Sequence, residues 1–297
     1  MQPVKHLAVA VVLIAACGGS VTTPVPVPPA PPLFVPTAFA VKVSGAGRPV
    51  IFIPGLASPG SVWDGTVAHL AGTKQVHVLT LAGFAGQPPI KPPFLLTVHD
   101  QIVQYIHANH LDHPIIVGHS LGGMMALWLA ETNSADLGGV VDVEGLPFLP
   151  AVADSKVTEA QGAAFGQQMH DKLVKTPPAQ FAATMKMFLA TMITKPEDLD
   201  RITAESAKSD IETYATAIAE LASKDLRPDL ARITTKVTVI AAGNAGDTPR
   251  PTLEQAWHTQ IDPIKGSELH FVDDAKHFVM LDQPSAFFVQ LDQALAR

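Results

Sequence analysis

The stretch IIVGHSLGGMM, residues 115–125, places one serine, Ser120, between two glycines at the end of an apolar run. The residues before Ser120 are apolar and β-branched, which is typical of a buried strand. From Leu121 onward the composition and spacing indicate a helix. A serine in the pattern G-x-S-x-G at a strand-to-helix turn is typical of a nucleophile, because the tight turn exposes the hydroxyl at the helix N-terminus. The stretch predicts an α/β fold with Ser120 as its reactive residue.

The composition limits the class of protein. The chain has 297 residues, of which 47% are hydrophobic, and this is enough for one large core. Charged residues make up 16% of the chain and the net charge is −7. No basic stripe is present, so the sequence argues against a nucleic-acid partner. We expect a globular domain that acts on a small molecule.

The N-terminus has the features of an export signal. Lys5 precedes an apolar run, residues 7–16, which is shorter than the roughly 20 residues that span a bilayer. Cys17, the one cysteine of the chain, follows in the sequence IAAC. This sequence resembles the lipobox of bacterial lipoproteins, in which the cysteine is lipidated. The resemblance implies a signal peptide over 1–16 and an exported lipoprotein that faces the periplasm or the cell exterior. The alternative is an ordinary signal peptide that is cut after Ala40.

A proline-rich stretch follows the cysteine. Seven prolines lie between Pro24 and Pro36, and such a run forms neither helices nor sheet ladders. An extended tether over residues 17–40 is the prediction. Contact with a membrane is expected only through the lipid anchor.

Strand and helix patterns alternate from residue 41 onward. The strands are expected at 41–45, 48–53, 75–79, 114–117, 139–144, 236–242 and 268–272, and the helices at 61–70, 97–109, 121–131, 251–258 and 284–296. The first two strands are joined by Gly45-Ala46-Gly47, which indicates a hairpin-like turn. The alternation predicts a mostly parallel sheet flanked by helices, formed by residues 41–145 and 231–297.

Residues 146–230 interrupt this alternation. They contain no convincing strand, and helices are expected at 156–173, 178–193, 197–207 and 211–224. Because the segment lies between two strands of the sheet, it is interpreted as an inserted helical cap.

Four further stretches support a resemblance to a known family. They are VIFIPGLASPGSVW (50–63), LTLAGFAGQPP (79–89), VTVIAAGNAGD (237–247) and FVDDAKHFVMLDQP (271–284). With G-x-S-x-G, they resemble the α/β-hydrolase fold superfamily, in particular its capped members similar to serine esterases and lipases. Pro54 stands where histidine is commoner in that family.

The resemblance implies a catalytic triad in the order Ser, Asp, His. His277 is the expected base, because serine needs a neighbouring group to accept its proton. Asp247 is expected to orient His277. Glu144 or Asp142, which follow or end the strand after Ser120, are the alternatives that stay open.

The oxyanion hole and the pocket are also expected from the sequence. The family pattern places two backbone N–H donors at Leu56 and Leu121. The candidate pocket residues are Trp63, Met124, Phe181, Met185 and Phe188. The last three share a helical face with Met192, and this face would either pack in the core or form a flexible apolar wall for a substrate.

The sequence therefore predicts a serine hydrolase that cleaves carboxylic esters through an acyl-enzyme. No metal or organic cofactor is expected. Hydrolysis of a lactone or an amide, or a non-catalytic lipoprotein that binds a ligand, are the alternatives. The oligomeric state is left open.

Overall fold

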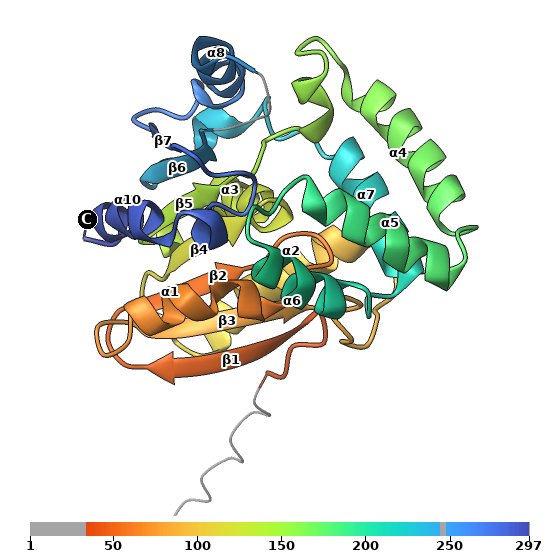
Figure 1. Ribbon diagram of the computed structural model, residues 1–297. Helices are drawn as coiled ribbons and strands as arrows, with labels where there is room; N and C mark the ends of the chain where they lie inside the picture. Colours follow the sequence, from red (N-terminus) through yellow and green to blue (C-terminus); the bar gives the residue numbers. More distant parts are fainter. Residues whose placement is uncertain (1–33, 244–247, 297) are drawn as a thin grey trace, which may run out of the picture. The chain divides into compact units, whose positions relative to one another are not determined.

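The computed structural model describes residues 34–243 and 248–296, and one sheet lies at the centre of this part of the chain (Figure 1). Within these residues seven strands pair in the order β1-β3-β2-β4-β5-β6-β7. The strands are β1 (Phe39–Gly45), β2 (Pro49–Ile53), β3 (Gln75–Leu81), β4 (Ile115–His119), β5 (Gly139–Val143), β6 (Val237–Ala242) and β7 (Glu268–Val272). Only the pairing of β1 with β3 is antiparallel. The prediction of a mostly parallel sheet is confirmed.

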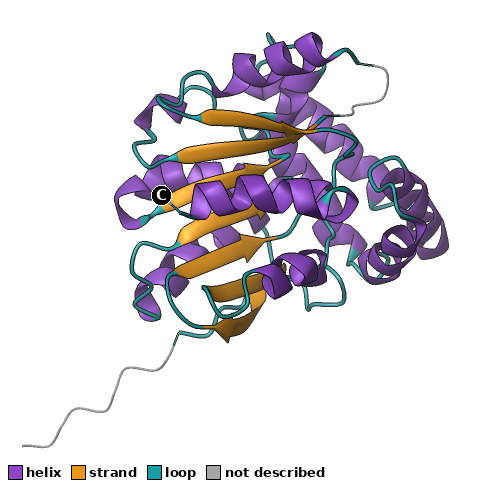
Figure 2. Ribbon diagram, turned by 60° about the vertical axis from the view of Figure 1, so that its left-hand side comes forward, coloured by secondary structure: helices purple, strands orange, loops and turns teal. Residues whose placement is uncertain are grey.

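Four of the interior strands are buried along their whole length. Every residue of β2, β4, β5 and β6 is buried, as expected for a parallel sheet whose two faces are both covered. Helices supply this cover on both sides (Figure 2). The helices of the sheet region are α1 (Asp64–His69), α2 (Phe94–Ala108), α3 (Leu121–Asn133), α8 (Arg250–Ile261), α9 (Val279–Asp282) and α10 (Pro284–Leu295), with short 3-10 helices η1 (Gly60–Trp63) and η2 (Ser134–Asp136).

The predicted hairpin between the first two strands is wrong. β1 does not pair with β2, because β3 lies between them. The burial of the strands explains this order. β1 is partly exposed along its length, whereas β2 is fully buried, so β1 is suited to the edge of the sheet and β2 to its interior.

Four α-helices lie between β5 and β6, within residues 146–230, which we name the helical insertion. They are α4 (Glu159–Leu173), α5 (Pro178–Ala190), α6 (Pro196–Ser206) and α7 (Ile211–Ser223), with η3 (Leu149–Val152) and η4 (Leu230–Arg232) at the two ends. All residues of the insertion are described, and none of them is in a strand.

The helical insertion is bound to the sheet region at α2. The carboxylate of Glu220, in α7, accepts hydrogen bonds from the backbone N–H groups of Phe94 and Leu95 at 2.8 and 2.6 Å. These N–H groups belong to the first turn of α2, where the backbone donors have no partner within the helix. A side chain of the insertion thereby caps a helix of the sheet region.

The predicted signal peptide, Cys17 and most of the predicted tether lie outside the described residues. In the part of the chain that the structure describes, no helix combines the length and the apolar character needed to cross a membrane.

Candidate active site

Ser120 occupies a strained position between β4 and α3. Its backbone angles are φ 56° and ψ −117°, a conformation that costs energy in a residue other than glycine and that recurs at functional sites. The neighbouring glycines make this turn possible. A Cβ atom at Gly118 would collide with the carbonyl oxygen of Gly122, and one at Gly122 with the carbonyl oxygen of Ile53. The G-x-S-x-G pattern is therefore required by the close approach of backbone on both sides of Ser120.

His277 lies in the loop between β7 and α9, and its imidazole contacts a carboxylate. Its Nδ1 atom is 3.0 Å from Oε2 of Glu144, which directly follows β5. Because a carboxylate only accepts hydrogen bonds, the proton of the neutral ring lies on Nδ1, and Nε2 is free to act as a base. The two side chains are 22% and 16% exposed, so the pair lies at the surface of a cavity rather than in bulk solvent.

Glu144 is held in place by the sheet. Its second oxygen accepts a hydrogen bond from the N–H of Ala242, at the end of β6, at 2.7 Å. Its backbone has φ 58°, a left-handed conformation that is uncommon outside glycine. Glu144 therefore has both the fixed position and the backbone strain of a residue with a functional role.

The acid that the family resemblance implied, Asp247, lies outside the described residues, so its role stays a prediction. Of the two alternative acids, Glu144 and Asp142, the one that contacts His277 is Glu144. Asp142 is fully buried, and its Oδ1 accepts from the N–H of Gly145 at 2.8 Å. Burial raises the pKa of the Asp142 carboxyl well above its usual range. Asp142 thus shapes the turn that carries Glu144 and does not contact His277.

His119, which precedes Ser120, supports the loop that carries His277. It is fully buried, its ring centroid lies 4.6 Å from that of His277, and its Nε2 donates to the carbonyl oxygen of His277 at 3.0 Å. Burial lowers the pKa of His119 well below its ordinary value, which keeps the ring neutral. The sequence gives no signal for this contact, because His119 and the His277 loop are distant in the chain.

The two predicted oxyanion donors lie beside Ser120. Leu121 is the first residue of α3, and a Cβ atom at Gly55 would lie 3.2 Å from the Cβ of Ser120. The loop that contains Gly55 and Leu56 is therefore packed against Ser120. Within the described residues, neither the Leu56 nor the Leu121 N–H has a hydrogen-bond partner, so both can donate to a ligand.

The loop of His277 is bound to the helical insertion. The N–H of Phe278 donates to the carbonyl oxygen of Met192 at 3.2 Å. Asp282, which is 5% exposed, accepts from the N–H of Thr194 and from the N–H of Lys276, both at 2.8 Å. These bonds fix the segment on either side of His277.

Ser120, His277 and Glu144 open into one cavity of about 950 Å³. Most of its other lining residues are apolar and come from both the sheet region and the helical insertion. They include Leu121, Met124, Leu146, Leu149, Val152, Met192, Leu221, Leu253 and Trp257. The polar residues of the wall include Gln260, Asp274 and Lys276.

Of the predicted pocket residues, Met124 lines this cavity and the other four do not. Trp63 is fully buried and packs against Phe52. Phe181 and Met185 are each 4% exposed and form the inward face of α5, and the Phe181 ring contacts Tyr214 of α7. Phe188 faces solvent and is 47% exposed. The spacing of four residues from Phe181 to Met185 is therefore core packing within the insertion.

In the described residues, no group of three or more His, Cys, Asp and Glu side chains is arranged to hold a metal ion.

With this geometry in place, the family can be stated. A family model described as the alpha/beta hydrolase family matches residues 50–291. The chain belongs to the alpha/beta hydrolase family. The match includes both halves of the sheet region, the helical insertion and the segments that carry Ser120, Glu144 and His277, and it supports an enzyme of the hydrolase class.

Two curated relatives are similar to this chain over most of its length. The chain is 26% identical over 254 residues to the 3-oxoadipate enol-lactonase 2 of Acinetobacter baylyi, which covers 85% of the chain and 90% of that relative. It is 25% identical over 277 residues to the pimeloyl-[acyl-carrier protein] methyl ester esterase of Vibrio cholerae, which covers 86% of the chain and 97% of the esterase.

Solved structures share the alpha/beta hydrolase fold. A thermophilic esterase from Thermogutta terrifontis superposes with a TM-score of 0.72 at 18% identity, covering 87% of this chain and 93% of the esterase. A hydrolase from Pseudomonas aeruginosa has a TM-score of 0.72 at 19% identity and covers 87% and 94% of the two chains. The predicted fold class is confirmed.

Proposed function

We propose that this member of the alpha/beta hydrolase family is a serine hydrolase that cleaves carboxylic esters. The observation that carries the proposal is the meeting of Ser120, at a strained strand-to-helix turn, with the hydrogen-bonded pair of His277 and Glu144 at one apolar cavity. A nucleophile, a base and a carboxylate that orients the base are the parts that acyl transfer needs.

The reaction would proceed through an acyl-enzyme. Oγ of Ser120 attacks the ester carbonyl while Nε2 of His277 accepts its proton, and the oxyanion receives hydrogen bonds from the N–H groups of Leu56 and Leu121. The C–O bond to the alcohol then breaks, and Nε2 returns the proton to the leaving oxygen. In the second half, Nε2 deprotonates a water that attacks the acyl carbon, and the acid leaves as Ser120 recovers its proton.

We assign the orienting carboxylate to Glu144 rather than to Asp247. The 3.0 Å contact between Glu144 and Nδ1 of His277 supports this assignment. The carboxylate would hold the ring in the tautomer that leaves Nε2 basic and would stabilise the imidazolium after proton transfer.

The experiment that tests the proposal is covalent labelling of the purified full-length protein by a small fluorophosphonate. The expected result is label on Ser120, located by mass spectrometry of the modified peptide, with loss of the label in Ser120→Ala and strong slowing in His277→Ala. Hydrolysis of p-nitrophenyl esters is measured in parallel. A folded protein that takes no label and hydrolyses no ester would instead be the ligand-binding protein that was the alternative.

A lactone is the second candidate substrate, and the similarity to an enol-lactonase favours it. A lactone is an internal ester, so the same residues would open it, and the released alcohol would remain attached to the acyl-enzyme. The comparison of kcat/KM for matched esters, lactones and amides of equal chain length separates these substrates.

We also propose that the protein is exported and lipidated at Cys17. Lys5, the apolar run and the sequence IAAC support this proposal. The expected outcome is incorporation of a clickable fatty acid into the full chain expressed in a bacterium, with none in Cys17→Ser. Label that persists in Cys17→Ser would contradict the assignment.

A further inference from the structure

Gln260 is a buried amide within the wall of the catalytic cavity. It lines the cavity near the end of α8 and is 3% exposed. Leu253 and Trp257 line the same cavity and precede Gln260 by seven and three residues, which places the three side chains on one face of the helix. The amide of Gln260 is thus a polar group on an otherwise apolar face of α8 that lines the cavity.

The backbone determines which end of this amide faces the cavity. The N–H of Phe148 donates to Oε1 of Gln260 at 3.1 Å. Because a backbone N–H only donates, the oxygen must be the end turned to Phe148, and the –NH₂ group is the other end. Within the described residues this nitrogen has no hydrogen-bond partner. This nitrogen is not among the fully buried unpaired polar atoms, and Gln260 lines the cavity, so the –NH₂ group can donate to a ligand there that supplies an acceptor.

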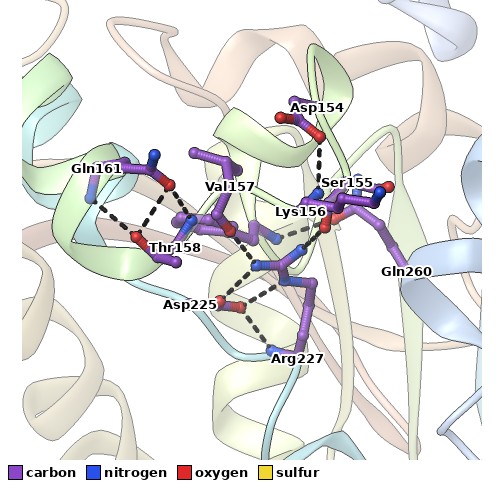
Figure 3. Close-up of polar contacts among 10 residues, drawn as sticks. Asp154, Ser155, Lys156, Val157, Thr158, Gln161, Asp225, Arg227 and Gln260 are labelled. Atoms are coloured by element: carbon purple, nitrogen blue, oxygen red, sulfur yellow. Dashed lines mark hydrogen bonds and ion pairs between the residues drawn. The ribbon is translucent and has the colours of Figure 1, made fainter.

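The partner of Gln260 is held rigidly. The guanidinium of Arg227 lies 4.6 Å from the centre of the Phe148 ring. Arg227 binds both oxygens of Asp225, at 2.9 and 2.7 Å, and donates to the carbonyl oxygens of Ser155 and Val157 at 2.8 Å each (Figure 3). This network fixes Phe148, and Phe148 in turn fixes the orientation of Gln260.

We propose that Gln260 determines substrate specificity by donating a hydrogen bond to an oxygen of the substrate beyond the scissile ester group. The inference rests on the proposed function of Ser120 as the nucleophile. The substrate class is an ester with a largely apolar chain that carries a ketone or carboxylate oxygen. Lys276 also lines the cavity, and its ammonium would attract a carboxylate more strongly than a ketone because the hydrogen bond would join opposite charges.

The test compares esters that differ only in this oxygen. The probes are p-nitrophenyl octanoate, its analogues with a ketone at successive carbons beyond the third, and the analogue that ends in a carboxylate. We expect kcat/KM of the wild type to be roughly 5- to 10-fold higher for one oxygenated ester than for octanoate. Gln260→Leu should abolish this preference, so that the ratio of kcat/KM for the oxygenated ester to kcat/KM for octanoate falls to about one.

Gln260→Glu provides the sharper variant. A carboxylate still accepts the hydrogen bond from Phe148 but has no donor for the substrate, so the preference should invert while the local structure is kept. Gln255→Leu, at an exposed position of the same helix, is the matched control and should retain the wild-type preference.

The outcomes distinguish this inference from the proposed function. Equal losses for all esters in both Gln260 variants, or a preference that survives Gln260→Leu, would overturn the inference while labelling of Ser120 stands. A wild-type enzyme that hydrolyses all the esters at the same rate would also overturn the inference. A protein with neither labelling nor turnover would overturn the proposed function and this inference with it.

Discussion

At the scale of single residues, the site depends on which carboxylate meets His277. Two acidic candidates follow strands of the sheet region in the sequence, Glu144 directly after β5 and Asp247 five residues after the last residue of β6. The structure brings Glu144 to 3.0 Å from Nδ1 and binds its other oxygen to the backbone of Ala242. Neutralising Glu144 and Asp247 one at a time tests which of the two carboxylates orients His277.

Glu144→Gln should lower kcat for ester hydrolysis by at least about 10³-fold, because the amide neither fixes the productive tautomer nor stabilises the imidazolium. Asp247→Asn is the matched control and should stay within a fewfold of the wild type. Steady-state kinetics on p-nitrophenyl butyrate checks both variants. A large loss in Asp247→Asn with an active Glu144→Gln would return the role to Asp247.

His119 gives the chain a pH-dependent stability. Burial lowers the pKa of His119 well below 6.5, so below that pH the unfolded chain binds a proton that the native state excludes. The free energy of unfolding therefore falls as the pH falls below 6.5, by up to about 1.4 kcal/mol per pH unit from this residue.

His119→Gln removes this titration and keeps a donor near the carbonyl oxygen of His277. The free energy of unfolding of both proteins is measured in urea at about pH 7.5 and about pH 5.5. Between the higher and the lower pH, the wild type should lose more stability than the variant. Asp142, whose pKa is raised by burial, is common to both proteins and cancels in this difference. A difference that is the same at both pH values would contradict the prediction.

At the scale of elements, the turn from β4 to α3 depends on missing side chains. Gly122→Ala would place a Cβ atom against the backbone of Ile53, which cannot move aside because β2 is buried in the sheet. We expect a loss of about 2–3 kcal/mol in stability and a strong loss of activity.

Gly65→Ala is the control for the turn. Gly65 lies in α1, and no atom lies within 4 Å of the position that its Cβ would occupy, so alanine should stabilise the protein by up to about 1 kcal/mol through helix propensity. Thermal unfolding compares the two variants. Equal stability of both would show that the close approach at Gly122 does not matter.

The sequence predicts the helices and strands better than it predicts which of them pair or pack together. Alternating strand and helix patterns locate the sheet, because burial on both faces leaves continuous apolar runs such as that of β4. The hairpin prediction failed because the turn residues Gly45 and Gly47 say nothing of β3, which lies between β1 and β2. Phe181 and Met185 have a helical spacing that is the same for a core face and a pocket wall, so only the packing against Tyr214 separates the two.

At the scale of the whole described unit, the helical insertion is hydrogen-bonded to the loop of the sheet region that carries His277. Asp282 accepts three hydrogen bonds, from the N–H and the hydroxyl of Thr194 in the insertion and from the N–H of Lys276 beside the base. One buried carboxylate thus links the cavity wall to the position of His277.

Asp282→Ala leaves these donors without an acceptor and should destabilise the protein by about 2–4 kcal/mol. Because the loop of His277 loses its anchor, kcat should also fall by at least about tenfold. Asp292→Ala, which removes an exposed partner of His69, should change neither quantity appreciably. Unfolding and kinetics of the two variants side by side provide the measurement, and a stable, fully active Asp282→Ala would refute the link.

The hydrogen bonds between residues 192–195 and the segment around His277 also limit how the protein can be re-engineered and how its helical insertion can change in evolution. The insertion is not a module that can be exchanged freely for that of a relative. A graft has to reproduce the carbonyl group at Met192 and the two donors of Thr194, or the loop of His277 loses these hydrogen bonds. New substrate ranges are therefore more accessible through point changes in the wall, at positions such as Leu253 and Trp257, than through transplantation of the whole segment.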